Sequence, residues 1–418
     1  MKKTLLSILT LTFTIVLNAQ TWTILNSGST SNLKGIHFPT TLSGYAVGDN
    51  GTILKTIDGG TTWTNLTTAF PGDWFWDVHF TSVDTGFVVG ETDPGMNPSG
   101  LGLIIKTIDG GASWTTLVSG LSSPPRDLFV VNKDTIFACG GAEQTYSRIA
   151  KSIDGGTTWT QIGTPELDAI TGGMYFLNSN VGFVGQYIFT AYASYLNTND
   201  GSTFSVYNIP SSGGYWNFAS DFPDASHGYF TRSTYVGSDS VYLRRTNDGG
   251  TTWNESVIPA FTGSIYGLDF VDASTGYIVG SSGVIRKTAD GGSIWSAQTS
   301  NTTQDLRSVC FVNQNLGFAA GANGTILKCA IPVGISETNS PNEPVMIYPN
   351  PSTGVFQINN ICKITNVSVY NQMGEMLISK NDFMNYSTLD LSLFADGLYT
   401  ILIRSDKGNQ SLQVLKCK

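Results

Sequence analysis

Five aspartates in this chain of 418 residues have the same neighbours, which makes them the first candidates for chemistry. Each lies two positions after Ser or Thr, immediately before a Gly-Gly pair and five positions before a Trp. They are Asp58, Asp109, Asp154, Asp248 and Asp290, and a degraded sixth copy places Asn199 in the same slot. Such a carboxylate can bind a metal, transfer a proton or accept hydrogen bonds from turn amides. Copies spaced by roughly 40 to 50 residues cannot converge on one substrate, so we expect them to be structural.

Residue types that bind metals or nucleic acids are sparse. His37 and His79 occupy the same slot of two successive repeats; a two-histidine metal site is one interpretation, and packed neutral imidazoles are the one we expect. The net charge is −9 and the sequence holds no cluster of Lys and Arg. Phosphate backbones are bound by such clusters, so nucleic acid is not expected as a partner. We also expect no metal and no cofactor.

A second signature predicts the elements that position these residues. It reads G-[YF]-x-x-G or a variant, precedes each bend, and occurs seven times, at 44–48, 86–90, 136–140, 182–185, 228–231, 276–280 and 317–321. Strands are predicted on both sides of it, at 33–38 and 52–56 in the first repeat, and another begins at Trp63. Four short strands at this period predict an all-β chain folded as a seven-bladed β-propeller.

The seventh repeat is incomplete, and its missing part lies at the other end of the chain. Residues 321–330 match 48–57, after which the pattern stops, whereas residues 20–25 resemble the strand that follows a bend, at 61–66. Pairing of residues 20–25 with 324–329 would complete the last blade and leave no open sheet edge. We therefore expect the propeller to span residues 20–331 and to close through its first strand.

Aromatic residues outside the repeat predict where a ligand binds. Six of the nine tryptophans occupy repeat positions, and the other three lie where one blade leads into the next. Loops at these junctions share a face with those between the second and third strands, opposite the repeated bends. The candidate ligand-binding residues there are Trp74, Phe75, Trp76, Arg126, Tyr215, Trp216, Tyr266 and Arg307. They suit a peptide or a glycan, although these rings could instead plug the central channel.

The blade pattern resembles the family of photosystem II assembly and stability factors over roughly residues 20–330. The repeated bend is the Asp-box. Members of that family are seven-bladed propellers that bind newly made membrane-protein partners and are not enzymes. They are associated with a basic surface patch, whereas this chain is acidic; it is expected to be one of the secreted bacterial proteins that share the repeat without photosynthesis. The resemblance implies a non-catalytic binding role.

Asp-boxes also occur in glycosidases, which supply the alternative function. Sialidases use an arginine triad, and the scattered arginines of this chain show no recognisable one. Xyloglucanase-type enzymes use two carboxylates and usually carry two propellers in one chain, whereas one is predicted here. We expect no catalytic residues, and a glycoside hydrolase acting on extracellular glycans is kept as the runner-up.

Both ends of the chain indicate export. Residues 1–19 have a basic start, an apolar run and a small residue before Gln20, as in a secretory signal peptide, and no other long apolar segment follows. Residues 332–345 are rich in Pro, Asn and Ser and are predicted to be a linker. Residues 346–418 predict a small Ig-like β-sandwich and resemble the type A C-terminal sorting domain of the type IX secretion system. That resemblance implies contact with the secretion machinery, followed by surface attachment or release. Cys362 and Cys417 could pair there.

Overall fold

The structure, a computed structural model, describes the chain from residue 21 with gaps. The described ranges are 21–66, 70–92, 101–117, 124–140, 148–162, 169–188, 192–198, 201–210, 215–216, 219–234, 241–258, 263–330, 346–350, 352–359, 364–371, 376–383, 386–405 and 408–417. The predicted signal peptide, the predicted linker, Asn199 and Cys362 lie outside them. Contacts separate Thr21–Ala330 from the C-terminal part, and each unit is described by itself.

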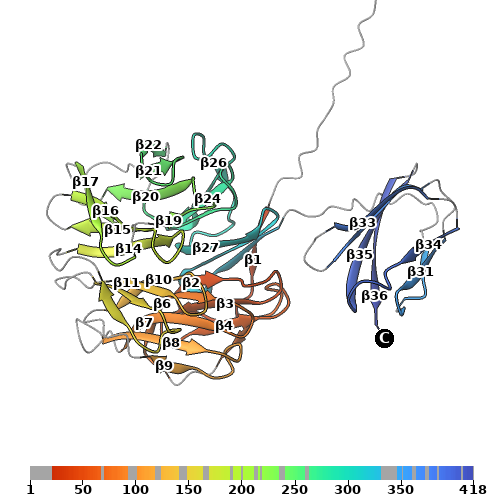
Figure 1. Ribbon diagram of the computed structural model, residues 1–418, viewed down its shortest axis with the longest axis horizontal. Coiled ribbons are helices and arrows are strands. Elements are labelled where there is room, and N and C mark those ends of the chain that lie inside the picture. Colours follow the sequence, from red (N-terminus) through yellow and green to blue (C-terminus); the bar gives the residue numbers. More distant parts are fainter. Residues whose placement is uncertain are drawn as a thin grey trace, which may run out of the picture. The chain divides into compact units, whose positions relative to one another are not determined.

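Seven antiparallel sheets make up the first unit, and each is one blade (Figure 1). From the inside outwards, blade 1 holds β2 (Leu33–His37), β3 (Gly44–Gly48), β4 (Ile53–Thr56) and β5 (Thr64–Asn65); blade 2 holds β6 (Trp74–Phe80), β7 (Gly86–Thr92), β8 (Leu101–Thr107) and β9 (Thr115–Leu117). Blade 3 holds β10 (Pro125–Val130), β11 (Ile136–Gly140), β12 (Arg148–Ser152) and β13 (Thr160–Ile162); blade 4 holds β14 (Ala169–Phe176), β15 (Gly182–Ile188), β16 (Tyr192–Thr198) and β17 (Ser205–Pro210).

Blade 5 differs in that its innermost strand has two parts, β18 (Tyr215–Trp216) and β19 (Ser220–Asp221), both paired with β20 (Gly228–Thr234). It continues with β21 (Val241–Thr246) and β22 (Asn254–Ile258). Blade 6 holds β23 (Ile265–Phe270), β24 (Gly276–Gly280), the 3-10 turn η1 (Ser281–Gly283), β25 (Ile285–Thr288) and β26 (Ser296–Gln298). Blade 7 holds β27 (Leu306–Asn313), β28 (Leu316–Gly321), the turn η2 (Ala322–Gly324), β29 (Ile326–Ala330) and, outermost, β1 (Thr21–Leu25).

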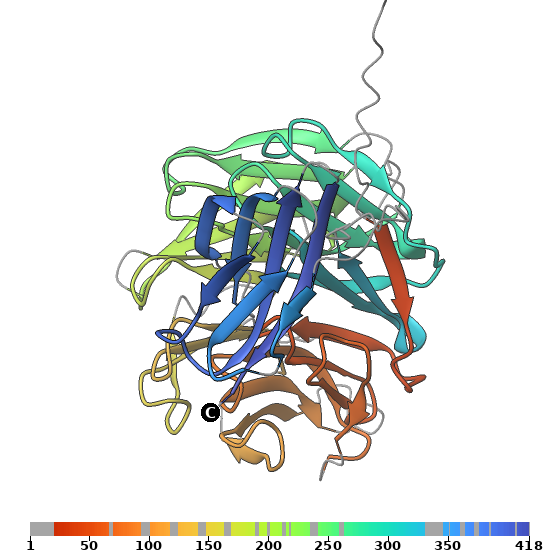
Figure 2. The same cartoon turned by 90° about the vertical axis from the view of Figure 1, so that its right-hand side faces the viewer.

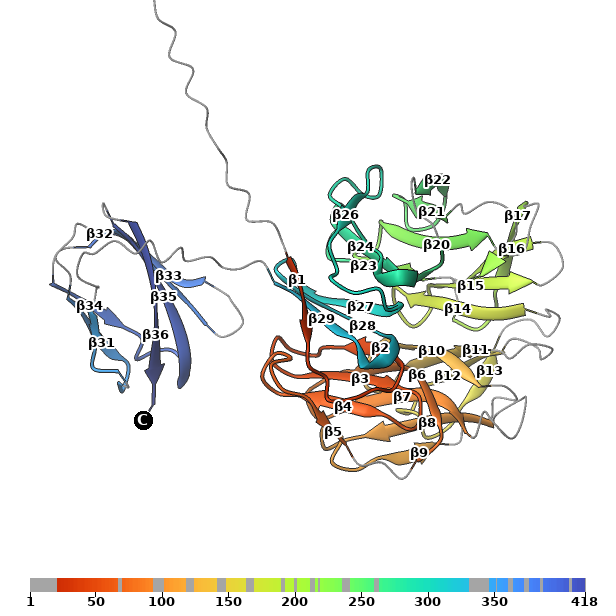
Figure 3. The ribbon, with the colours of Figure 1, turned by 180° about the vertical axis from the view of Figure 1, so that it is seen from behind.

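The ring closes through its first strand, as predicted. β1 pairs antiparallel with β29, from Thr21 opposite Ala330 to Leu25 opposite Ile326, and both views from front and back place them together (Figures 1 and 3). Trp22 is buried between blades 6 and 7, where its ring meets Tyr277 and Phe311 edge-on at 6.2 and 5.9 Å. The N-terminal strand therefore supplies both a sheet partner and a core side chain to the last blade.

A repeated aromatic stack joins neighbouring blades and explains the G-[YF] signature. The Tyr or Phe of each signature stacks on the Phe that ends the next blade's innermost strand, as Tyr45 does on Phe80 at 3.6 Å. The same stack joins Phe137 to Phe176, Phe183 to Phe222, Tyr229 to Phe270, Tyr277 to Phe311 and Phe318 to Phe38. Blade 3 departs from it, because Val130 stands where the other blades have Phe.

The glycine of the signature is required by the same Phe. A Cβ on Gly44 would lie 2.3 Å from ring atoms of Phe38, and one on Gly86 would lie 2.5 Å from Phe80. Blade 3 supports this explanation because it changes both partners. There Val130 faces Ile136, so a smaller side chain on one strand accompanies a larger one on its neighbour. The two positions exchange volume, as expected of a closely packed interior.

A second contact between blades starts from the basic residue that opens each Asp-box. Lys55 donates to the carbonyl oxygen of Gly110 in the next blade at 2.7 Å, and Lys106 donates to Gly155 at 2.8 Å. Equivalent bonds run from Lys151 to Gly201, from Arg245 to Gly291 and from Lys328 to Gly59. We call these contacts the latches. The last of them joins blade 7 to blade 1.

The C-terminal unit is a sandwich of two antiparallel sheets (Figure 2, blue strands). One contains β30 (Met346–Tyr348), β31 (Val355–Asn359) and β34 (Tyr386–Asp390); the other contains β33 (Met376–Phe383), β32 (Ile364–Tyr370), β35 (Gly397–Ser405) and β36 (Gly408–Lys416), in that order. Its core includes Phe356, Val367, Ile401 and Val414. Lys416 is 7 % exposed, and its ammonium donates to the Phe394 carbonyl and to Asp396 at 2.7 and 2.9 Å. This lysine therefore fixes the last strand.

Candidate functional site

The innermost strands line the central channel with a repeated pattern. In six blades a β-bulge in the innermost strand sets two residues against one on the neighbouring strand, for example between Leu33 and Gly35 and between Phe75 and Asp77. Such a bulge turns an extra side chain out of the sheet. In blades 1, 2, 3, 6 and 7 we count from the residue that precedes the bulge, which is Leu33 in blade 1 and Phe75 in blade 2. The second and fifth residues are at least partly exposed, as are the third residues Asp77, Asp127 and Ser308, whereas the first and fourth are buried. The partly exposed set forms the channel wall.

Loops that join blades meet the loops between second and third strands at one face of the ring. The N–H of Gly51, between β3 and β4, donates to the Asp73 carbonyl just before β6 at 2.7 Å. The Asp-boxes instead contact the loops after the innermost strands, as the bond from Gly59 to Leu42 shows. The predicted separation is therefore present. We call the first face the top face and the channel opening there the mouth.

The mouth at blades 1 and 2 is a stack of aromatic and cationic side chains. The Lys34 ammonium lies 4.1 Å from the Trp74 ring centroid and 3.6 Å from that of Trp76, and the two indoles meet edge-on at 6.3 Å. Asp49 pairs with Lys34 at 2.5 Å. Burial lowers the pKa of Lys34, while the hydrogen bond to Asp49 opposes that shift. Desolvated cation–π contacts of this kind contribute up to about 2 kcal/mol each.

Two further contacts between a cation and an aromatic ring lie in neighbouring blades. The Arg126 guanidinium in blade 3 lies 4.7 Å from the Trp76 centroid, and the indole N–H of Trp76 donates to the buried Glu91 at 3.2 Å. In blades 6 and 7 the Arg307 guanidinium lies 4.0 Å from the Tyr266 centroid and pairs with Asp305 at 3.0 Å.

Aromatic and cationic groups therefore occupy the position directly after the residue that precedes the bulge in five neighbouring blades, and each of three cations lies on a ring or beside a carboxylate. The residues are Tyr266, Arg307, Lys34, Trp76 and Arg126.

Only some of the ligand-binding residues predicted from the sequence lie together at the mouth. Trp74, Trp76, Arg126, Tyr266 and Arg307 lie at the mouth. Phe75 does not, and that prediction is wrong: its side chain is 0 % exposed and packs into the core between blades 1 and 2, since the residue next to a bulge points into the sheet interface. Tyr215 and Trp216 form β18 at the start of blade 5, and their side chains are not described.

Three residues of the mouth were not anticipated. Lys34 occupies the same strand position as Arg126 and Arg307, and comparing that position between repeats would have revealed it. Asp49 and Glu91 follow the second strands of blades 1 and 2, where only the loop length attracted notice. Their role depends on contacts with Lys34 and Trp76 that no spacing in the sequence announces.

Below the mouth, carboxyl groups bridge neighbouring blades. The innermost strands have no strand partner on their channel side, so some of their N–H groups need other acceptors. Each such carboxylate accepts from the following blade: Asp77 from Leu128 at 3.3 Å, Asp127 from Met174 and Asp221 from Phe270 at 2.6 Å, and Asp269 from Phe311. His37 accepts from Phe80 and Ser308 from Ile36 in the same way, both at 3.3 Å. These channel side chains hold the ring together.

Protein surrounds these groups and shifts their proton affinity. Desolvation raises the pKa of Asp77, and repulsion from the Asp127 carboxyl raises it further. Desolvation raises the pKa of Asp221 to about 7, and that of Asp269 in the same direction. Burial lowers the pKa of His79 to about 4 and that of His37 as well. The centroids of the two imidazoles lie 4.4 Å apart, with the rings tilted by 30°. Among the described residues there is no group of three or more His, Cys, Asp or Glu side chains that could hold a metal ion.

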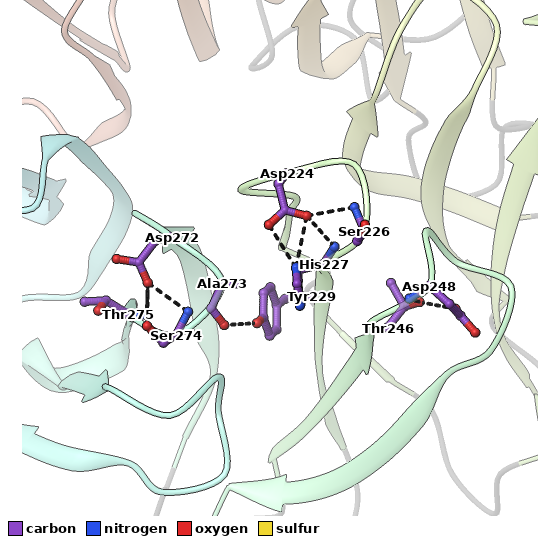
Figure 4. Close-up of polar contacts among 10 residues, drawn as sticks. All are labelled: Asp224, Ser226, His227, Tyr229, Thr246, Asp248, Asp272, Ala273, Ser274 and Thr275. Carbon is purple, nitrogen blue, oxygen red and sulfur yellow. Dashed lines mark hydrogen bonds and ion pairs between the residues drawn. The ribbon is translucent and has the colours of Figure 1, made fainter.

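The opposite face holds the Asp-boxes and a second kind of capped turn, which has no fixed motif in the sequence. Asp248 accepts from the Thr246 hydroxyl at 2.7 Å and from the Thr252 amide and hydroxyl at 2.8 and 2.6 Å. Figure 4 shows the second turn: Asp224 caps the N–H of Ser226 and His227, and Asp272 caps those of Ser274 and Thr275. Thr40, Ser82, Asn132 and Asn178 do the same in blades 1 to 4. Both turns are local structure.

The fourth Asp-box keeps the strand end and the latch of the others. Thr198 ends its strand opposite Gly182 just as Thr56 does opposite Gly44, and Lys151 bonds Gly201 as Lys55 bonds Gly110. Residues 199 and 200 lie outside the described ranges, so the assignment of Asn199 to the Asp slot stays a prediction.

Fold and site together define an exported Asp-box β-propeller with a C-terminal sorting domain. Residues 346–416 match the family model of the secretion system C-terminal sorting domain, and residues 15–125 match that of photosynthesis system II assembly factor YCF48. Both predicted resemblances are thereby confirmed. The sorting domain marks the chain for type IX export to the cell surface or the medium. No helix among the described residues is long and apolar enough to cross a membrane.

Solved structures agree with the propeller. YCF48 bound to D1 peptide is 18 % identical, with 75 % of this chain and 98 % of that one covered at a TM-score of 0.60. YCF48 from Cyanidioschyzon merolae is 19 % identical over 74 % and 99 %, at 0.59. The GH74 enzyme of Niastella koreensis is 14 % identical over 94 % and 66 %, at 0.58. At these identities the likeness concerns the fold alone. A search of the curated proteins gives no match.

Proposed function

We propose that this exported protein is a non-catalytic binding protein that takes an extended peptide at the mouth of its propeller. The observation that carries the proposal is the stack of Arg126, Trp76, Lys34 and Trp74, drawn from three blades onto one rim. Partly exposed rings held rigidly by neighbouring cations provide contact area at little entropic cost, which is how many binding surfaces are built.

A peptide suits the charge pattern of this rim better than a uniformly charged polymer does. Lys34, Arg126 and Arg307 alternate with the carboxylates of Asp49, Glu91 and Asp305. Acceptors and donors of both signs match the mixed side chains and backbone amides of a polypeptide. One of the solved propellers that resembles this chain is itself described as bound to a peptide, although that likeness supports only the fold.

The channel carboxyl groups do not supply the pair that the runner-up, a glycoside hydrolase, would need. Glycosidases separate their two carboxyl groups by about 5 to 9.5 Å so that a sugar or a water fits between them. Asp77, Asp127, Asp221 and Asp269 all accept backbone N–H groups of the next blade, and the carboxyl groups of Asp77 and Asp127 lie close enough to repel each other. Their geometry supports a structural role.

The test uses the full exported chain on peptide and glycan arrays, followed by calorimetry with the strongest peptide. Arg307→Ala and Trp74→Ala are the variants, because Arg307 is exposed and its loss is not expected to affect folding. We expect each to weaken binding at least tenfold. Lys133→Ala, exposed on the opposite face, is the control. Unchanged affinity in both folded variants would exclude the mouth, and hydrolysis of an arrayed glycan would favour the enzyme.

A further inference from the structure

The outer edge of strand β36 in the sorting domain is covered over only half its length. β36 pairs with β35 in an unbroken register over nine residues and has no further strand beside it in the sheet. Near its end the Asn350 amide accepts from the Leu415 N–H at 2.8 Å and donates to the Gln413 carbonyl at 2.9 Å. Ser352 continues this cover through backbone bonds to Leu415 and Cys417 at 3.0 and 2.9 Å.

Alternation along the strand identifies the groups that the cover leaves open. In an antiparallel pair, residues alternately direct both backbone groups toward the partner strand and away from it. The backbone N–H and C=O of Leu415 both point away from β35. The same is therefore true of every second residue before it, namely Gln413, Ser411 and Asn409, and of these only the Gln413 carbonyl is bonded by Asn350. Among the described residues, the sheet holds no further strand beyond β36 that could pair with these outward groups. We call Asn409–Gln413 the open edge.

Other edges of the sandwich are protected in ways that the open edge is not. Natural sheets protect their edges with charged residues, prolines, bulges or short strands. β33 carries Lys380 and pairs with β32 through a register shift, while β30 and β34 have only three and five residues. The open edge has no charged residue, no proline and no bulge. A flat, unprotected edge of this kind is a template for another strand.

We propose that the secretion machinery recognises the folded sorting domain by adding one of its own extended segments to the open edge of β36. Main-chain hydrogen bonds to Asn409, Ser411 and Gln413 would hold that segment. Asn350 occupies the next pair of backbone groups and so sets where the added strand ends. In this view the Y-P-N-P segment both completes the sandwich and defines the register of its partner.

The test removes one outward N–H without touching the pairing with β35. Ser411→Pro in the full chain deletes that donor, and its ring would occupy the space of an added strand; proline is tolerated at such edge positions. We expect a folded variant, judged by an unchanged melting transition of the sandwich, that accumulates in the periplasm of a type IX-competent host with at least a fivefold lower surface or secreted fraction. Ser411→Ala keeps the N–H and is the matched control, exported like the parent.

A second variant keeps the test decisive if Ser411→Pro does not fold. Asn409→Pro removes the other open N–H, close to the strand end where the sandwich is least affected. Normal export of either folded proline variant would overturn the proposal, as would loss of export in Ser411→Ala. If the mouth of the propeller fails its own binding test, this proposal is unaffected, because the two rest on different units.

Discussion

Lys328 in the last blade donates a 2.8 Å hydrogen bond to the carbonyl oxygen of Gly59 in the first. The same latch joins Lys55 to Gly110 and Lys106 to Gly155, so ring closure repeats an ordinary contact between blades. We expect Lys328→Met to lower the free energy of unfolding by about 1 kcal/mol, because a partly buried charged donor is lost. Denaturant titration measures it, with the exposed Lys133→Met as control. Equal stability of the two variants would show that the latch contributes nothing.

The exchange of volume between Phe38 and Gly44 can be tested by copying blade 3 into blade 1. Gly44→Ile alone forces a side chain into space held by the Phe38 ring, 2.3 Å away, and should cost about 1–3 kcal/mol or more. Adding Phe38→Val reproduces the pair of Val130 and Ile136, and we expect it to recover at least half of that loss. Urea unfolding of both variants decides, and a double variant no more stable than the single one contradicts the explanation.

The buried carboxyl of Asp221 should make the propeller less stable as the pH rises. Its folded pKa, about 7, lies above the ordinary value of 3.8 because of desolvation, so its contribution is full below about pH 4 and is lost between pH 4 and 7. Asp269 and Tyr175 face the same space. Asp221→Asn keeps an acceptor for the Phe270 N–H but cannot ionise. Its melting temperature should therefore change less over pH 4 to 7 than that of the parent, whereas an equal slope would rule Asp221 out as the cause.

The Asp-boxes should have the opposite effect, making the propeller less stable as the pH falls in the acid range. Hydrogen bonds from a Thr or Ser hydroxyl, then from backbone amides, lower the pKa of Asp58, Asp109, Asp154 and Asp248 to about 2. Their contribution is present above the unfolded value near 4 and is lost as the pH falls toward 2. Melting curves from pH 5 to 2 should show this decline, and Asp109→Asn should reduce it. If the melting temperature of Asp109→Asn fell as much as that of the parent, the loss of stability in acid would have to come from other groups.

Much of the ring was predictable because each repeat carries local signals. The turn aspartates, the G-[YF] signature and the incomplete seventh repeat are all visible in the sequence, and they fixed the strands near 44–48 and the partner of β1 within about two residues. Blade 3 shows the limit of such alignment. Its Val130 and Ile136 replace the Phe and Gly of the other blades, and only the strand pairing reveals that the two side chains face each other.

The mouth was harder to predict because it depends on contacts between blades. Trp74 and Trp76 stood out as tryptophans without a repeat role, but Lys34, which lies against both, looks like an ordinary strand residue in sequence. Phe75 was predicted to bind ligand because it lies between Trp74 and Trp76 in the sequence. The bulge that buries its side chain depends on how two strands pair and is not visible in the sequence. The channel carboxyls were passed over because their acceptor role needs the adjacent blade, as Asp127 needs Met174.

The pairing of β1 with β29 has a consequence for how the chain folds. Of the described strands, β1 is synthesised first, yet its partner Ile326–Ala330 follows about three hundred residues later. Contacts of such sequence separation are slow to form, because a long loop must be closed before they contribute any stability. Until then β29 exposes an unpaired edge and Trp22 remains outside the core, which makes the unclosed ring prone to aggregation. The exported chain therefore needs either protection or time before its last blade is complete.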